Sequence, residues 1–158
     1  VRKGPLLLEG LLRVPFVIAG PGVASRAGMC RGLCEHIDFF PTLLEMLGIE
    51  APRGVEGRSF AALLAGAASS HRRRALVEMH HQYQLDRNVK ALVKDRWKLI
   101  YWGGQDYGEL YDLDDDPLET TNLWNAPDLA SVKDGLIHEL LDELVVTENI
   151  LPFPVAPA

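Results

Sequence analysis

The stretch Trp97-Lys98-Leu99-Ile100-Tyr101-Trp102 decides the fold of this chain. Its aromatic and aliphatic residues favour a pleated strand, and Asp95-Arg96 joins it by a tight turn to an earlier run, 89–94, in which Val89, Ala91 and Val93 alternate with other residues. Two further short runs flank this pair: 75–79 on one side, and 109–113 after Gly103-Gly104 on the other. Four strands at this spacing predict an antiparallel sheet.

A helix is predicted after the sheet, from about Leu129 to Val145, with Asp128 as its N-cap. Its apolar residues recur at helical spacing on one face: Leu129, Val132, Leu136, Leu140 and Leu144. We expect this face to cover one side of the sheet.

The N-terminal half has a different pattern. Arg13–Ala19 is apolar and β-branched and is closed by Gly20-Pro21-Gly22, which predicts a buried strand of the parallel kind. A third glycine is missing, so we exclude a dinucleotide-binding loop. His36–Gly48 predicts a helix that Asp38 caps and Gly48 ends, with an apolar stripe of Ile37, Phe40, Leu44 and Leu47.

A second, short helix is predicted over Phe60–Ala65, with Ser59 as its cap. The small and polar residues 67–73 then indicate a boundary between two structural units.

Composition excludes several classes of function. The formal net charge of −6 argues against a nucleic-acid partner, because phosphate affinity needs a surplus of Lys and Arg. No apolar run approaches the roughly 20 residues that span a bilayer, so no membrane partner is expected. Cys30 and Cys34 lack a second cysteine pair, which favours free thiols or an incidental disulfide over a zinc site. The compartment stays open.

The residues offer no self-contained active site. No serine stands in a nucleophile-elbow context, and no histidine pair has metal-binding spacing. The acidic stretch 112–117 lacks the glycine and glutamate of a calcium loop and favours a turn. His80-His81 forms a cluster, but adjacent strand residues face opposite sides. Lys3 is either a surface lysine or an anion contact at a sheet edge.

The motifs together resemble the sulfatase family. The segment before the predicted strand fits the pattern K-G-x-x-x-x-E-G-x-x-R-V-P, through Lys3-Gly4-Pro5, Glu9-Gly10 and Arg13-Val14-Pro15. Further matches follow in the family's order: Gly20-Pro21-Gly22, His36–Leu44, Gly57-Arg58-Ser59-Phe60, Leu63–Gly66, Arg96–Tyr101, and Glu109–Leu113 with Asp116-Pro117, Glu119 and Asn122-Leu123. Each motif is modest by itself, and their order carries the resemblance.

The resemblance implies an α+β chain. Residues 1–70 would end an alkaline-phosphatase-like α/β/α domain, and residues 71–158 would form a small domain of a four-stranded antiparallel sheet packed with a C-terminal helix. The family's nucleophile is a formylglycine made in C/S-x-P-x-R, and neither Cys30 nor Cys34 matches that motif. We therefore expect the nucleophile and the ligands of calcium or another divalent metal to lie upstream, in a chain that begins inside an active-site motif. No metal is expected from these residues, and the fragment alone should be inactive.

One catalytic residue is implied here, Lys3, which in the family contacts the sulfate. A fixed ammonium would offset the negative charge that develops on the sulfuryl oxygens of a sulfate-ester substrate. We also expect His80, His81 and Tyr83 to border the substrate pocket, with an ordinary polar hairpin loop as the alternative. The predicted strand within residues 6–23 has edges that could support self-association.

Two other functions stay open. A phosphonate or phosphate ester hydrolase of the same superfamily would suit Lys3 equally well. A non-catalytic scaffold or binding module is the alternative from a different class. The upstream reading frame would separate the enzyme from the module, and competitive turnover of sulfate and phosphonate esters would separate the enzymes.

Overall fold

A computed structural model describes residues 6–24, 28–81 and 87–147, with residues 80, 81 and 87 described by their backbone alone. The chain forms two compact units. The sheet unit comprises Val1–Phe16 and Arg74–Asp142, and the helical unit comprises Val17–Arg73 and Glu143–Ala158. The elements in chain order are α1 (Glu9–Leu12), η1 (His36–Asp38), α2 (Phe39–Met46), α3 (Ala61–Leu64), β1 (Arg74–His81), β2 (Arg87–Lys94), β3 (Trp97–Trp102), β4 (Gly108–Asp112), η2 (Pro127–Leu129) and α4 (Ala130–Thr147).

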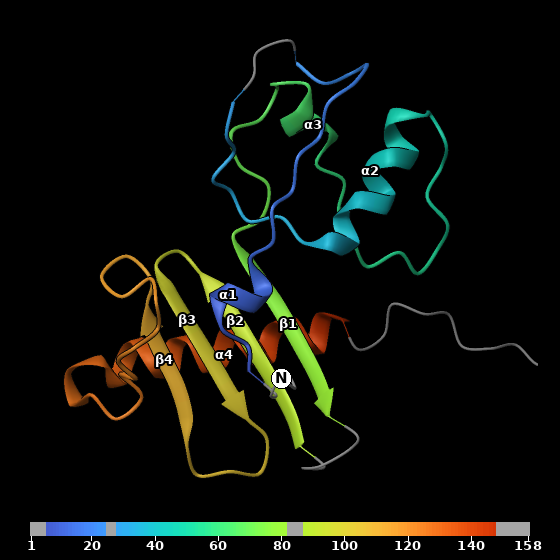
Figure 1. Cartoon of the computed structure of the whole chain (residues 1–158). Coiled ribbons are helices and arrows are strands. Elements are labelled where there is room, and N and C mark those ends of the chain that lie inside the picture. The colour runs from blue at the N-terminus through green and yellow to red at the C-terminus, as the bar shows by residue number, and fades with distance from the viewer. Residues whose placement is uncertain (1–5, 25–27, 82–86, 148–158) are drawn as a thin grey trace, which may run out of the picture. The chain divides into compact units, whose positions relative to one another are not determined.

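The predicted antiparallel sheet is confirmed. Its four strands lie in the order β1-β2-β3-β4, so each strand pairs with its neighbour in sequence (Figure 1). The register sets Ala91 opposite Ile100 and Ile100 opposite Glu109. The predicted turn at Asp95-Arg96 joins β2 to β3, with Asp95 at a φ of 52°, a left-handed conformation that aspartate tolerates in turns.

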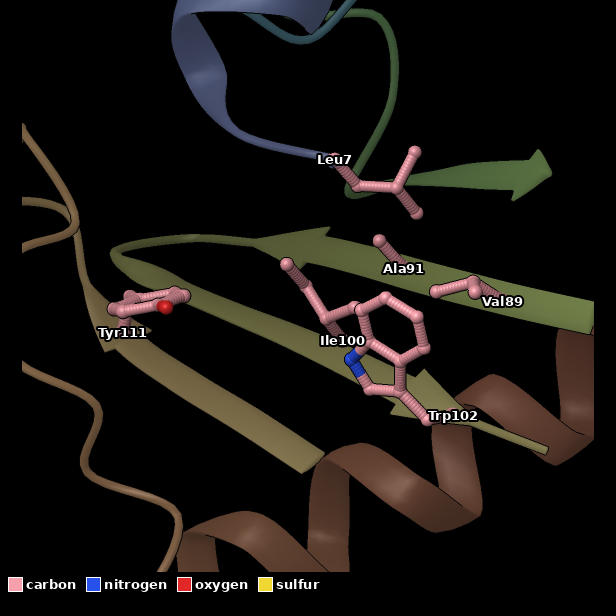
Figure 2. Packing of buried hydrophobic residues seen from close by; sticks show 6 residues of the cluster. All are labelled: Leu7, Val89, Ala91, Ile100, Trp102 and Tyr111. Atoms are coloured by element: carbon pink, nitrogen blue, oxygen red, sulfur yellow. The ribbon is translucent and has the colours of Figure 1, made fainter. Parts of the chain in front are cut away.

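The two faces of the sheet are covered by different parts of the chain. On one face, here the α1 face, Leu7 of the N-terminal segment is 2% exposed and packs on a core from three strands (Figure 2): Val89, Ala91, Ile100, Trp102 and Tyr111. Helix α4 lies on the opposite, α4 face (Figure 2). Its Leu136 and Leu140 are buried, which confirms the predicted apolar side of this helix.

The helical unit contains the predicted helices with different ends. The helix predicted over His36–Gly48 begins with the single turn η1, continues as α2, and is closed by Gly48 at a φ of 68°. Asp38 does not cap α2, because its carboxylate is engaged elsewhere. The predicted apolar stripe is largely exposed, whereas Pro41 and Thr42 are buried.

The strand predicted over Arg13–Ala19 is wrong. This run is irregular, and Val17 is 89% exposed. A buried parallel strand needs neighbours on both sides. In the described residues the sheet consists of four consecutive antiparallel strands and does not include this run. The edge expected to support self-association is therefore not a strand. The short helix α1, which periodicity did not predict, precedes the run.

Across the described ranges, no helix combines the length and the apolar character that a membrane crossing requires.

Candidate functional site

The residues predicted to carry function fall mostly outside the described structure. Lys3 and Tyr83 lie outside the described residues, and so do the side chains of His80 and His81. The backbone of the two histidines ends β1, where His80 pairs with Asn88 and His81 with Arg87. A role for these residues in a substrate pocket stays a prediction.

The segment that directly follows the Lys3 motif is described. Leu7 is buried in the core of the α1 face, and α1 begins two residues later. The helix is a single turn: the amide of Leu11 donates to the carbonyl of Leu8 at 2.8 Å, and that of Arg13 to Glu9 at 2.8 Å. One turn cannot sustain itself in water, so the position of α1 depends on contacts with the sheet.

Those contacts include a buried lysine. Lys98 of β3 points to the α1 face and is 0% exposed. Its Nζ lies 3.1 Å from Oε1 of Glu9 and 2.7 Å from Oε1 of Glu119. A buried ammonium is stable only when it is paired, and here one cation is shared between two carboxylates.

Glu119 closes this group, which we call the Lys98 cluster (Glu9, Lys98 and Glu119). Its side chain is 2% exposed, and its Oε2 accepts a hydrogen bond from the backbone amide of Glu9 at 2.6 Å. Its Oε1 has no well-oriented hydrogen-bond donor and instead faces the charge of Lys98. Glu119 is held at a φ of 57°, an uncommon conformation for a residue with a side chain. Sheet, loop and α1 are thus joined at one point.

A second polar group occupies the same face. Glu109 accepts hydrogen bonds from Nε1 of Trp102 at 2.8 Å and from the hydroxyl of Tyr111 at 2.7 Å. Burial, together with the nearby carboxylate of Glu109, raises the pKa of Tyr111, so its hydroxyl stays a donor. The hydrogen bonds of Glu109 join only residues of β3 and β4. The polar contacts between the sheet and Glu9 are those of the Lys98 cluster.

An open depression of about 330 Å³ adjoins the cluster. Its lining is mixed, with one acidic and one basic side chain among apolar ones: Glu9, Gly10, Arg13, Leu113, Pro117 and Leu118. Glu9 is therefore both a member of the Lys98 cluster and part of this wall, and its side chain is 21% exposed.

The helical unit has a polar centre of its own, the Asp38 cluster (Glu35, Asp38, Arg58, His71 and Arg72). The carboxylate of Asp38 accepts from the amides of Glu35 at 3.0 Å and Arg58 at 2.8 Å, and it pairs with Arg72 through two guanidinium nitrogens. Burial by itself would raise the pKa of Asp38, but hydrogen bonds led by that from Arg72 hold it well below its usual range. A carboxylate whose oxygens are all engaged is suited to structure rather than proton transfer.

No metal site is present in the described parts of the chain, where His, Cys, Asp and Glu side chains form no group of three or more that could hold an ion. Cys30 and Cys34 are free and exposed. Partial shielding of its sulfur from water and the neighbouring Cys30 raise the pKa of Cys34, so it is mainly a thiol at neutral pH. These residues do not fit a metal centre.

Comparison with family models assigns this chain to one family. The model of "N-sulphoglucosamine sulphohydrolase, C-terminal" matches residues 4–146. An arylsulfatase of Clostridium perfringens is 32% identical over 146 residues, which cover 90% of this chain and 30% of that protein. The chain therefore spans less than a third of the length of this relative.

Solved structures show the same likeness. A 2-O GAG sulfatase superposes with a TM-score of 0.75 and 25% identity, covering 83% of this chain and 29% of that chain. A phosphonate monoester hydrolase from Silicibacter pomeroyi superposes with a TM-score of 0.66 and 25% identity, covering 73% of this chain and 26% of that chain. The predicted four-stranded sheet with its helix is thus the architecture of the C-terminal part of these enzymes.

Proposed function

This chain belongs to the N-sulphoglucosamine sulphohydrolase C-terminal family of sulfatases, and from that membership we propose that the whole protein hydrolyses sulfate esters. The observation that carries the proposal is the family match over residues 4–146. The match begins one residue after Lys3 and includes all three members of the Lys98 cluster. The substrate is then a sulfate ester, bound by a protein of which this chain is one part.

The proposal divides the chemistry between two regions. A formylglycine nucleophile and a divalent metal, calcium or another, would come from residues other than these 158. The sequence supports the first part of this division, because neither cysteine stands in C-x-P-x-R. Residues 1–70 would then belong with the catalytic domain and residues 71–158 with the small domain, and the isolated chain would show no multiple-turnover hydrolysis.

Lys3 is the contribution of this chain to the reaction. Lys3 precedes the buried Leu7 by four residues, so their Cα atoms are at most about 14 Å apart. The described packing of Leu7 therefore limits the space that the Lys3 ammonium can reach. An ammonium fixed near the sulfuryl oxygens would stabilise the charge that builds there during transfer.

A lysine substitution in the full-length protein tests this role. Lys3→Ala should lower kcat/KM for an aryl sulfate by about 100-fold, the usual effect of removing one preorganised charge-stabilising donor. Lys90→Ala is the control, since Lys90 pairs with Glu78 at the edge of the sheet. Wild-type kcat/KM in Lys3→Ala would refute the role of Lys3.

A phosphonate ester hydrolase is the second candidate, because a phosphonate monoester hydrolase is among the structural neighbours. Lys3 would suit either anion, so the two activities must be compared directly. The kcat/KM ratio for matched aryl sulfate and phenyl phosphonate esters decides between them: a ratio above one supports the sulfatase.

The histidines that end β1, together with Tyr83, are proposed to border the substrate pocket and to set selectivity among esters. Replacing His81 and Tyr83 should change kcat/KM unequally across a panel of sulfate esters if these residues border the pocket. Equal specificity constants across the panel would identify the segment as an ordinary hairpin loop.

A further inference from the structure

We propose that Lys98 is a positioning residue for the Lys3 motif: through Glu9 and Glu119 it fixes α1 on the sheet and so sets where the preceding segment can lie. Part of this inference, that the segment serves catalysis, rests on the proposed function. The structural part rests on the Lys98 cluster alone.

The first argument is burial. Lys98 is 0% exposed, although a lysine side chain normally keeps its charge in water. Lys94, four residues earlier on the adjacent strand, is partly exposed and pairs with Glu139 of α4. The sheet therefore carries three paired lysines, Lys90, Lys94 and Lys98, of which only Lys98 is fully withdrawn from solvent and directed to the N-terminal segment.

The second argument is direction. Leu7 holds the segment by apolar contact, which is not directional. The Lys98 cluster adds two oriented attachments: the ammonium of Lys98 holds the side chain of Glu9, and the carboxylate of Glu119 holds its backbone amide. Together they fix both the position and the rotation of the first residue of α1.

The third argument is charge balance. Two carboxylates face one ammonium, so removing the ammonium leaves two like charges without compensation in a mostly buried place. Glu119 is enclosed, whereas Glu9 has a partly exposed side chain and can turn towards water. Loss of Lys98 is therefore expected to release Glu9, and α1 with it, rather than the loop that carries Glu119.

A double-mutant cycle in the full-length protein tests the proposal. Lys98→Met should lower kcat/KM for an aryl sulfate by at least about tenfold, because small misplacement of a catalytic group is costly. Lys94→Met, the matched control on the α4 face, should change it less than about twofold. In a Lys3→Ala background, Lys98→Met should cause no further loss, because both changes remove the same contribution.

Hydrogen exchange provides the second measurement. Glu9→Gln keeps the shape of the side chain and the hydrogen bond that the backbone amide of residue 9 donates to Glu119, but it removes the charge that pairs with Lys98. It is the milder variant if Lys98→Met does not fold. In both variants the amides of Leu11 and Arg13 should exchange faster than in wild type, while those of β2 should not.

The outcomes separate the two proposals. Equal losses in Lys98→Met and Lys94→Met, multiplicative losses in the cycle, or unchanged exchange in α1 would each overturn the positioning role. If Lys3→Ala retains full activity, the proposed role of Lys3 fails. Faster exchange in α1 would then still show that Lys98 holds this segment, and unchanged exchange would refute that as well.

Discussion

Asp38→Asn is the sharpest test of how the helical unit is held together. Oδ2 of Asp38 accepts from the amide of Glu35 at 3.0 Å and from Nε of Arg72 at 2.7 Å, and lies 3.0 Å from Nε2 of His71. Asparagine can keep the bonds to Oδ1 but sets an NH₂ donor where Oδ2 stood. Two N–H donors would then face a donor, and the guanidinium would lose its closest anion.

The expected loss follows from this geometry. Breaking a buried ion pair by removing one charge costs about 3–5 kcal/mol. Arg72 keeps a second partner, because its Nη1 lies 2.8 Å from Oε2 of Glu35. The loss should therefore lie near the lower end, about 3 kcal/mol of the free energy of unfolding at pH 7.

The pH dependence has a definite sign. The folded-state pKa of Asp38 is held below its unfolded value by hydrogen bonds that outweigh the effect of burial. Its contribution is thus complete above an unfolded pKa of about 3.9 and is lost as the pH falls towards the folded value. The difference between wild type and Asp38→Asn should be constant from pH 7 to 5 and narrow by about 1.4 kcal/mol for each pH unit below about 3.9.

Urea unfolding followed by circular dichroism measures these differences. Asp134→Asn is the control, because Asp134 is an exposed acid on α4 whose substitution should change stability by less than about 0.5 kcal/mol. A loss below about 1 kcal/mol for Asp38→Asn at pH 7 would contradict the proposed strength of the Asp38 cluster. So would a difference that stays constant below pH 3.9.

Two further changes probe the packing. A Cβ at Gly57 would lie 1.9 Å from the carbonyl oxygen of Ile37, so Gly57→Ala should lower the free energy of unfolding by at least about 2 kcal/mol. A Cβ at Gly135 on α4 would meet nothing within 4 Å, so Gly135→Ala should raise that free energy by about 0.5–1 kcal/mol. Equal thermal midpoints of the two variants would refute the contrast. Glu139→Gln breaks two partly exposed ion pairs to the sheet, so it should lower that free energy by less than about 1 kcal/mol and less still in 0.5 M salt, and a larger loss in urea unfolding would contradict this.

The sheet could be predicted from sequence because its signals are local. Alternation within 89–94, the turn at Asp95-Arg96 and the paired glycines 103–104 each act over a few residues, and together they fix strand order when every strand pairs with its neighbour. The helix after Pro127 is equally local in its apolar spacing, which lies within one segment. Asp128, predicted as its N-cap, instead lies inside the turn η2, and α4 begins at Ala130. Where contacts between residues close in sequence decide the structure, the sequence is enough to predict it.

The strand predicted over Arg13–Ala19 failed for the opposite reason. An apolar, β-branched run indicates only that the segment is suited to a buried sheet. The strands that would pair with it must come from other parts of the chain. The described residues provide none for this run, and Val17 is exposed. Helix α1 escaped prediction because a single turn has no period, and its stability comes from the sheet beneath it.

The Lys98 cluster shows the same limit in a functional setting. Nothing local distinguishes Lys98 from Lys90 or Lys94, since all three lie in strands of similar composition. Glu9, one of its partners, is 89 residues away in sequence, and Glu119 lies beyond the next strand. The sequence motifs around these residues lie far apart in the chain, and only the folded chain brings the three side chains together.

The placement of charge on the two faces of the sheet follows from what each face must hold. Helix α4 has 18 residues and two buried leucines, so apolar packing can seat it and its ion pairs through Glu139 can remain partly exposed. Helix α1 has four residues and few apolar contacts: Leu7 before it is buried, and Leu12 packs partly buried on the same core. These apolar contacts are not directional and do not by themselves set the rotation of the helix. An element that small acquires a defined place only from directional contacts, and directional contacts between charges are strongest where water is excluded. These two requirements predict the observed arrangement, with a fully buried lysine, Lys98, on the α1 face and a partly exposed one, Lys94, on the α4 face.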